Sequence, residues 1–232
     1  MTVADNLAAV EARVAAACAR AGRPRSSVRL LPVSKTHPGP VLREAYASGV
    51  RWFAENKVQE ASAKAVELAD LADVRWSFIG HLQTNKARDV AGFAHEFQAL
   101  DSLRVAEALD RRLQAVGRGL DVLIEVDTSG EDTKFGVPEG EVVALARSLA
   151  PYSALRLRGL MTVAANTPDP VVVAGCFDRL AALRARLLDA LGDGADELSM
   201  GMSGDFESAI EHGATCVRVG SAVFGARDYG PR

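Results

Sequence analysis

The chain has 232 residues, 48% of them hydrophobic and 25% charged, which is enough apolar material for the core of one large soluble domain. The formal net charge is -3 and the arginines are scattered, which excludes the concentrated basic surface of a nucleic-acid-binding protein. No apolar run reaches the roughly 18 residues that a membrane span needs, so no membrane partner is expected. Asp5, Glu11 and Arg13 interrupt the N-terminal apolar residues, which excludes a signal peptide.

The cysteines and histidines lack the spacing of a disulfide framework or a metal site. The three cysteines form an odd, widely separated set without a CxxC pair, which predicts neither disulfides nor thiolate ligands and indicates a reducing cytoplasm. The four histidines show no i,i+4 pairing and no nearby acidic cluster, so no metal is expected. These residues are Cys18, Cys176, Cys216, His37, His81, His95 and His212.

The first predicted element is an amphipathic helix whose apolar face carries Leu7, Val10, Val14 and Ala17. Eight short, β-branched runs then alternate with longer stretches of helical periodicity. The runs are Val28–Ser34, Val50–Ala54, Val74–Ile79, Glu96–Leu100, Asp121–Val126, Arg156–Met161, Glu197–Met200 and Thr215–Val219. The helical stretches are Gly39–Ala47, Val58–Ala69, Asn85–Ala91, Leu103–Val116, Pro138–Leu149, Pro170–Leu191 and Gly204–His212.

This alternation predicts an α/β fold with a parallel sheet. Eight is also the number of strands that closes a (β/α)8 TIM-type barrel, whereas an open doubly wound sheet has about five or six. The Pro/Gly clusters are local, and the sequence contains no linker or repeat. We therefore predict one barrel domain over residues 1–232, with the open sheet as the alternative.

Lys35 directly follows the first run. The active site of a parallel barrel lies at the carboxyl ends of its strands, so the Lys35 stem should emerge from the core into the barrel mouth. Partial desolvation disfavours the ammonium form and lowers the pKa of the Lys35 amine, as a Schiff-base lysine requires. The alternative is an ordinary solvated lysine at a strand end.

Polar residues also follow the second and third runs. Asn56 could donate to a ring oxygen of a ligand, or it could cap the helix that begins near Val58. His81, after Gly80, could contact a ring or act as a general acid or base, and the alternative is a hydrogen-bonded loop residue.

Two Gly/Ser turns follow the last two runs, at Gly201–Gly204 and at Gly220–Ser221. Barrels often bind phosphate here through backbone amides, and glycine lets the backbone approach an anion closely. The Ser203 and Ser221 hydroxyls add donors. Because the Asp205 carboxylate already occupies the positive end of the following helix, the phosphate should bind mainly to the loop amides and to Gly220–Ser221. Two ordinary serine-capped turns are the alternative.

Arg218 lies inside the last run, between two valines, where a charged side chain needs a partner. If it points to the mouth, it can face the ring of a ligand. An arginine beside a pyridine nitrogen keeps that nitrogen unprotonated and weakens the ring as an electron sink.

Six motifs, taken together, are specific to one protein family. They are Leu31–Lys35, Glu55–Glu60, Phe78–Lys86, Arg158–Thr162, Leu198–Ser203 and Val217–Gly220. Through them, and over essentially the whole chain, the sequence resembles the YggS/PROSC family of pyridoxal-phosphate-binding homeostasis proteins. That family is similar to the barrel domain of bacterial alanine racemase, a fold type III protein that binds pyridoxal 5'-phosphate (PLP).

The resemblance implies that Lys35 holds PLP as a Schiff base. It also implies a set of cofactor contacts around the phosphate, the pyridine nitrogen and the ring. The phosphate contacts are Ser203, Gly220 and Ser221, the nitrogen contact is Arg218, the ring contacts are Asn56 and Met161, and Ser199 and Met202 complete the set. The chain departs from the family pattern at Ala54, where glycine is expected, and at Ser77, where histidine is expected.

The function implied is that of a cytoplasmic, monomeric carrier, which buffers PLP, passes it to apo PLP-dependent enzymes and performs little or no catalysis. Racemisation needs an acid or base on each face of the substrate, and alanine racemase-like enzymes take a tyrosine from a second, β-rich domain. We expect that domain to be absent because the chain ends at Arg232, and none of Tyr46, Tyr152 and Tyr229 follows a predicted strand. The alternatives are a PLP-dependent amino-acid racemase of low activity, a cofactor-free lysine aldolase acting on a phosphosugar, and an interaction scaffold.

Overall fold

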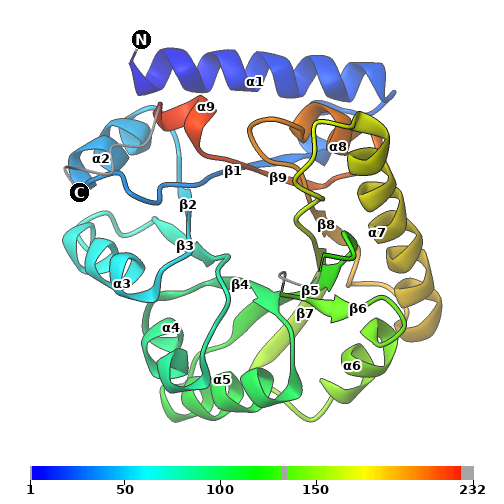
Figure 1. Ribbon diagram of the computed structural model, residues 1–232. Helices are drawn as coiled ribbons and strands as arrows, with labels where there is room; N and C mark the ends of the chain where they lie inside the picture. The colour runs from blue at the N-terminus through cyan, green and yellow to red at the C-terminus, as the bar shows by residue number, and fades with distance from the viewer. Residues whose placement is uncertain (1, 132–134, 226–232) are drawn as a thin grey trace.

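The computed structural model describes residues 2–131 and 135–225, which form a ring of parallel strands with helices outside it (Figure 1). The strands are β1 (Arg29–Pro32), β2 (Trp52–Glu55), β3 (Arg75–Phe78), β4 (Glu96–Leu100), β5 (Leu120–Asp127), β6 (Val137–Pro138), β7 (Leu155–Met161), β8 (Glu197–Ser199) and β9 (Cys216–Val219). The helices are α1 (Val3–Arg20), α2 (Gly39–Ala47), α3 (Val58–Glu67), α4 (Ala87–Phe93), α5 (Leu103–Ala115), α6 (Val142–Ser148), α7 (Pro170–Leu191), α8 (Phe206–Glu211) and α9 (Ser221–Phe224), with 3-10 turns η1 (Arg25–Ser27) and η2 (Thr84–Lys86). The predicted α/β barrel is confirmed.

The strands follow one another around the ring in the order β1-β9-β8-β7-β5-β4-β3-β2. The first and last strands of the chain are neighbours, paired in parallel from Arg29 opposite Cys216 onwards. The β1–β2 seam is joined by a parallel bridge between Val33 and Ala54, and the Ser34 amide donates to the Ala54 carbonyl oxygen at 3.0 Å. The ring is therefore closed at the carboxyl end of β1, directly before Lys35.

The structure differs from the sequence-based expectation between β5 and α6. Val126 pairs with Val137 in the two-residue strand β6, which the sequence pattern did not predict. Pro138 was expected to open a helix, but it ends this strand instead, and α6 begins at Val142. A proline is tolerated at the edge of a sheet because its missing amide removes no required hydrogen bond there.

Helix α1 forms as the apolar spacing predicts, and its apolar face is buried. A reciprocal capping box starts it: the Thr2 hydroxyl accepts from the Asp5 amide at 3.1 Å, and the Asp5 carboxylate accepts from the Thr2 amide at 3.0 Å. The helix lies along the outside of the ring and contacts α8 and α9 (Figure 1). Among the helices of the described residues, none combines the length and the hydropathy needed to cross a bilayer.

The interior of the barrel contains buried polar side chains at the amino ends of the strands. The Arg29 guanidinium lies 2.6 Å from a Glu96 carboxylate oxygen and 2.5 Å from one of Glu197. The second Glu96 oxygen accepts from the Ser77 hydroxyl at 2.6 Å and from the Gln98 amide nitrogen at 2.7 Å. Glu96, on β4, therefore links β1, β3 and β4, and Arg29 extends the cluster to Glu197 on β8, so loss of Glu96 should destabilise the whole barrel.

Replacing this carboxylate by Glu96→Leu should lower the free energy of unfolding by about 3 kcal/mol, because Arg29 and Gln98 each lose a buried partner. Urea denaturation followed by circular dichroism measures this loss. The matched control is Glu211→Leu, whose carboxylate pairs with Arg20 at 2.7 Å on the surface, and it should cost less than about 1 kcal/mol. Equal losses in both variants would contradict a structural role for the interior cluster.

Candidate functional site

A pocket of about 260 Å³ lies at the barrel mouth, at the carboxyl ends of β1, β3, β8 and β9. It is lined by Val33, Lys35, Ile79, Met202, Ser203, Gly204, Arg218, Gly220 and Ser221. Six of the nine predicted cofactor-binding residues are in this lining: Lys35, Met202, Ser203, Arg218, Gly220 and Ser221. The fold thus brings together residues from both ends of the chain.

Lys35 is half-buried and follows two buried residues, Val33 and Ser34. The backbone of this segment is held on both sides, because the Val33 amide donates to the Val219 carbonyl oxygen at 2.9 Å and the Ser34 amide donates across the β1–β2 seam to Ala54. The lysine stem therefore leaves a fixed strand end and lines the pocket, as the sequence predicts.

The two Gly/Ser turns face the same pocket and are tied to each other. The Gly220 amide donates to the Ser203 hydroxyl at 3.2 Å. A Cβ atom at position 220 would lie 3.2 Å from the Val33 carbonyl oxygen, so glycine lets this turn approach the strand that presents Lys35. The Asp205 carboxylate accepts from the Met202 amide at 2.5 Å and so shapes the first turn. Together the turns form a wall of small side chains and backbone amides suited to an anion.

Arg218 is 3% exposed and has partners, as its position inside the strand requires. Its guanidinium donates to the Ser199 hydroxyl at 2.7 Å and to the Thr162 carbonyl oxygen at 2.7 Å. The Ser199 hydroxyl in turn donates to Gln98 at 2.6 Å, which connects the pocket to the interior cluster around Glu96. Ser199 itself is fully buried and is not part of the pocket lining, so it contacts Arg218 from inside the barrel.

Glu125 is a titratable group near Arg218 that the sequence pattern does not mark as functional. Burial raises the pKa of its carboxyl to about 7, while the positive charge of Arg218 lowers it and the negative charge of Asp101 raises it. The available signal was its position near the carboxyl end of the fifth run. Periodicity cannot show that this acid lies close enough to a buried guanidinium to be influenced by its charge.

Asn56 directly follows β2 and Met161 is the last residue of β7, but neither belongs to the lining of the pocket. The Asn56 side-chain oxygen is buried and without a hydrogen-bond partner among the described residues. The capping alternative for Asn56 is wrong, because Lys57 is the N-cap residue of α3. Met161 is 1% exposed at the end of β7.

His81 fits the alternative of a hydrogen-bonded loop residue. Its Nδ1 atom lies 3.0 Å from an Asp101 carboxylate oxygen, and its ring stacks on Phe135 with centroids 3.9 Å apart. Tyr46 donates to Asp73 at 2.7 Å on the outside of the barrel, and Tyr229 lies outside the described residues.

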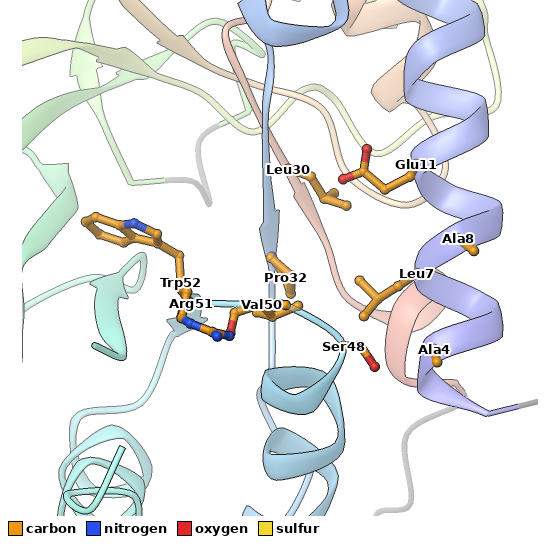
Figure 2. A pocket seen from close by; sticks show the side chains of 11 residues that line it. Ala4, Leu7, Ala8, Glu11, Leu30, Pro32, Ser48, Val50, Arg51 and Trp52 are labelled. Carbon is orange, nitrogen blue, oxygen red and sulfur yellow. The ribbon is translucent and has the colours of Figure 1, made fainter. Parts of the chain in front are cut away.

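A second cavity of about 590 Å³ lies between α1 and the segment Ser48–Trp52 (Figure 2). Most of its walls are apolar. The charged residues at its edge are already paired, since Glu11 binds Arg25 and Arg51 binds Asp73. Within the described ranges, no group of three or more histidine, cysteine or acidic side chains could hold a metal ion. The mouth pocket is therefore the stronger candidate for a functional site.

The sequence pattern of the alanine racemase N-terminal domain matches residues 6–228. The pyridoxal phosphate homeostasis protein of Pseudomonas aeruginosa is 45% identical, over 99% of this chain and 97% of that protein. The protein of the same name from Escherichia coli K12 is 40% identical, over 98% of this chain and 97% of that protein.

Two solved structures have a fold similar to that of this chain. PipY of Synechococcus elongatus PCC7942, with PLP bound, is 36% identical with a TM-score of 0.85, over 97% of this chain and 100% of that one. Alanine racemase of Clostridium difficile shares the fold alone, with 15% identity and a TM-score of 0.75 over 94% of this chain and 56% of that one.

Glu125→Gln should change how stability depends on pH. Between pH 4.5 and 7 the unfolded wild-type chain loses the Glu125 proton while the folded chain keeps it, so the wild-type protein loses stability as pH rises. Glutamine does not titrate, so the variant should gain about 3 kcal/mol relative to the wild type across this interval. Urea denaturation without added ligand at pH 4.5 and pH 8 measures the difference. Glu107→Gln, on the exposed face of α5, is the control, and parallel profiles for Glu125→Gln and the wild type would refute the expectation.

Proposed function

Since the chain belongs to the alanine racemase N-terminal domain family, we propose that it is a PLP-binding protein that takes part in the homeostasis of this cofactor. The observation that carries the proposal is the single pocket that unites the Lys35 side chain, the two Gly/Ser turns and the Arg218 guanidinium. The PLP-bound structure of PipY, a full-length relative, supports the same assignment.

The residues of the pocket fit the chemical groups of PLP. Bound PLP supplies an aldehyde that condenses with an amine, together with a ring that can accept electrons. The turns at Ser203 and Gly220 suit its phosphate, and Lys35 is the amine of the pocket lining. Asn56 lies outside the pocket lining, but its side-chain oxygen is buried without a hydrogen-bond partner among the described residues, and we propose the ring hydroxyl of PLP as its donor.

Arg218 decides what the pocket can do with the cofactor. A guanidinium has donors and no acceptor, so a pyridine nitrogen beside it stays unprotonated. An unprotonated ring is a weak electron sink, which favours retention of the cofactor over chemistry on an amino acid. We therefore propose a carrier that buffers PLP in the cytoplasm as a monomeric, single-domain protein and passes it to apo PLP-dependent enzymes, with little or no catalysis.

Borohydride treatment of the purified protein after PLP addition should fix a pyridoxyl group on Lys35, as peptide mapping would show. Lys35→Ala should abolish this label and the visible absorbance of the bound cofactor, whereas Lys57→Ala, at an exposed position, should change neither. A label on Lys57 or Lys86 alone would overturn the assignment. Protein that gains no visible absorbance on PLP addition would favour the cofactor-free aldolase, and steady racemisation of L-alanine or L-serine would show the racemase alternative.

Ser203→Ala tests the phosphate wall. Loss of one hydrogen bond to a charged phosphate should raise the Kd of PLP about tenfold. Pyridoxal has no phosphate, so its Kd should stay the same in this variant. Fluorescence titration with both ligands measures the two constants. An equal weakening for pyridoxal and PLP would mean that the Ser203 hydroxyl supports the loop rather than the phosphate.

A further inference from the structure

A buried ammonium group lies behind the segment that presents Lys35. Lys64, on α3, is 6% exposed. Its Nζ atom donates to Glu55 at 2.6 Å, to Glu60 at 2.7 Å and to the Ser34 carbonyl oxygen at 2.8 Å. These three acceptors match the three donors of an ammonium group. Lys64 is not part of the pocket lining, so its contacts are with the protein itself.

The same three side chains hold the residues on both sides of Lys35. The Ser34 hydroxyl donates to Glu55 at 2.7 Å, and the Thr36 amide donates to Glu60 at 2.5 Å. Burial raises the pKa of Glu55 above its ordinary value, and the charge of Lys64 and the Ser34 hydroxyl oppose this rise. The cluster of Lys64, Glu55 and Glu60 therefore fixes the backbone immediately before and immediately after the lysine.

Thr36, the residue after Lys35, has a strained backbone conformation. Its φ angle is 70°, and it is the one residue other than glycine in the described chain with a positive φ. This conformation is unfavourable for a β-branched residue and persists where surrounding contacts enforce it. The bond from the Thr36 amide to Glu60 is such a contact, and it sets the direction in which the chain leaves Lys35.

We propose that Lys64, together with Glu55 and Glu60, is a positioning cluster that aims the Lys35 amine at the aldehyde of PLP. This inference rests on the proposed function of Lys35. A buried group of one ammonium and two carboxylates is a poor source of stability, because desolvation offsets the attraction between the charges. Its position around a strained, reactive segment accounts for its presence better than a contribution to stability does.

Lys64→Met separates positioning from general stability, since methionine keeps most of the stem and removes the charge. Condensation of the Lys35 amine with the aldehyde forms a carbon–nitrogen bond and releases one water. This step should slow at least about tenfold in the variant, because misplacement of a reacting group by a small distance has a large effect on rate. Stopped-flow absorbance after mixing with PLP measures the rate.

Pyridoxine 5'-phosphate provides the discriminating readout. It carries the same ring and phosphate but an alcohol in place of the aldehyde, so its binding does not use the Lys35 amine. Its Kd should stay within about twofold of the wild-type value in Lys64→Met, since the turns at Ser203 and Gly220 are unaltered. Lys57→Met is the matched control at the exposed start of the same helix and should leave the rate and the Kd unchanged.

Two further variants keep the test decisive if Lys64→Met folds poorly. Glu60→Ala removes the acceptor of the Thr36 amide while Lys64 keeps Glu55, and it should show the same selective loss of rate. Thr36→Gly should restore part of the rate when combined with Lys64→Met, because glycine adopts a positive φ without strain.

The outcomes distinguish the two proposals. If the wild-type protein forms no bond between PLP and Lys35, the proposed function is wrong. If the wild type forms this bond and Lys64→Met and Glu60→Ala react at the wild-type rate, the positioning role alone is wrong. It is also wrong if pyridoxine 5'-phosphate binding weakens as much as the reaction slows, because the cluster would then support the whole pocket.

Discussion

The buried guanidinium of Arg218, which lines the mouth pocket, is the constraint around which the barrel interior is organised. A charge inside a protein must be matched by hydrogen bonds, and these come from Ser199 on the neighbouring strand and from the carbonyl oxygen of Thr162. The Ser199 hydroxyl in turn donates to the Gln98 side chain, and the Gln98 side chain donates to Glu96. A chain of hydrogen bonds thus runs from Arg218 at the mouth to Glu96 at the opposite end of the barrel and connects β4, β8 and β9. No local feature of the sequence indicates this connection.

Three sets of contacts hold the residues of the mouth in place. Ser199 and Thr162 bind the guanidinium of Arg218, and the turns at Ser203 and Gly220 are hydrogen-bonded to each other. The residues on both sides of Lys35 are bound by the cluster of Lys64, Glu55 and Glu60. The first two sets both involve β8 and β9 or the turns after them, and the third joins β2 and α3 to the end of β1, so each chemical group of a ligand meets a side chain or turn that is held by further contacts. This arrangement suits a protein that must hold one small molecule in a defined orientation.

The eight main strands could be predicted because parallel strands covered on both sides form short, nearly continuous apolar runs. The pocket residues Lys35, Ser203 and Gly220 could be predicted because strand ends and Gly/Ser turns are local features. The partners of Arg218 could not, since Gln98 and Ser199 are distant in sequence and a polar residue in a strand does not reveal what it faces. Lys64 was missed for a similar reason: on an amphipathic helix it looks like an ordinary exposed position.

The neighbouring positions of β1 and β9 have a consequence for the order of assembly. Lys35 lies near the start of the chain and Gly220 near its end, so the pocket cannot exist until the last strand has been added beside the first. Contacts of such large sequence separation form late, because the intervening chain must first be ordered. During synthesis the early lysine therefore emerges long before the turns that complete its pocket. The pocket residues therefore come together only when β9 has paired with β1.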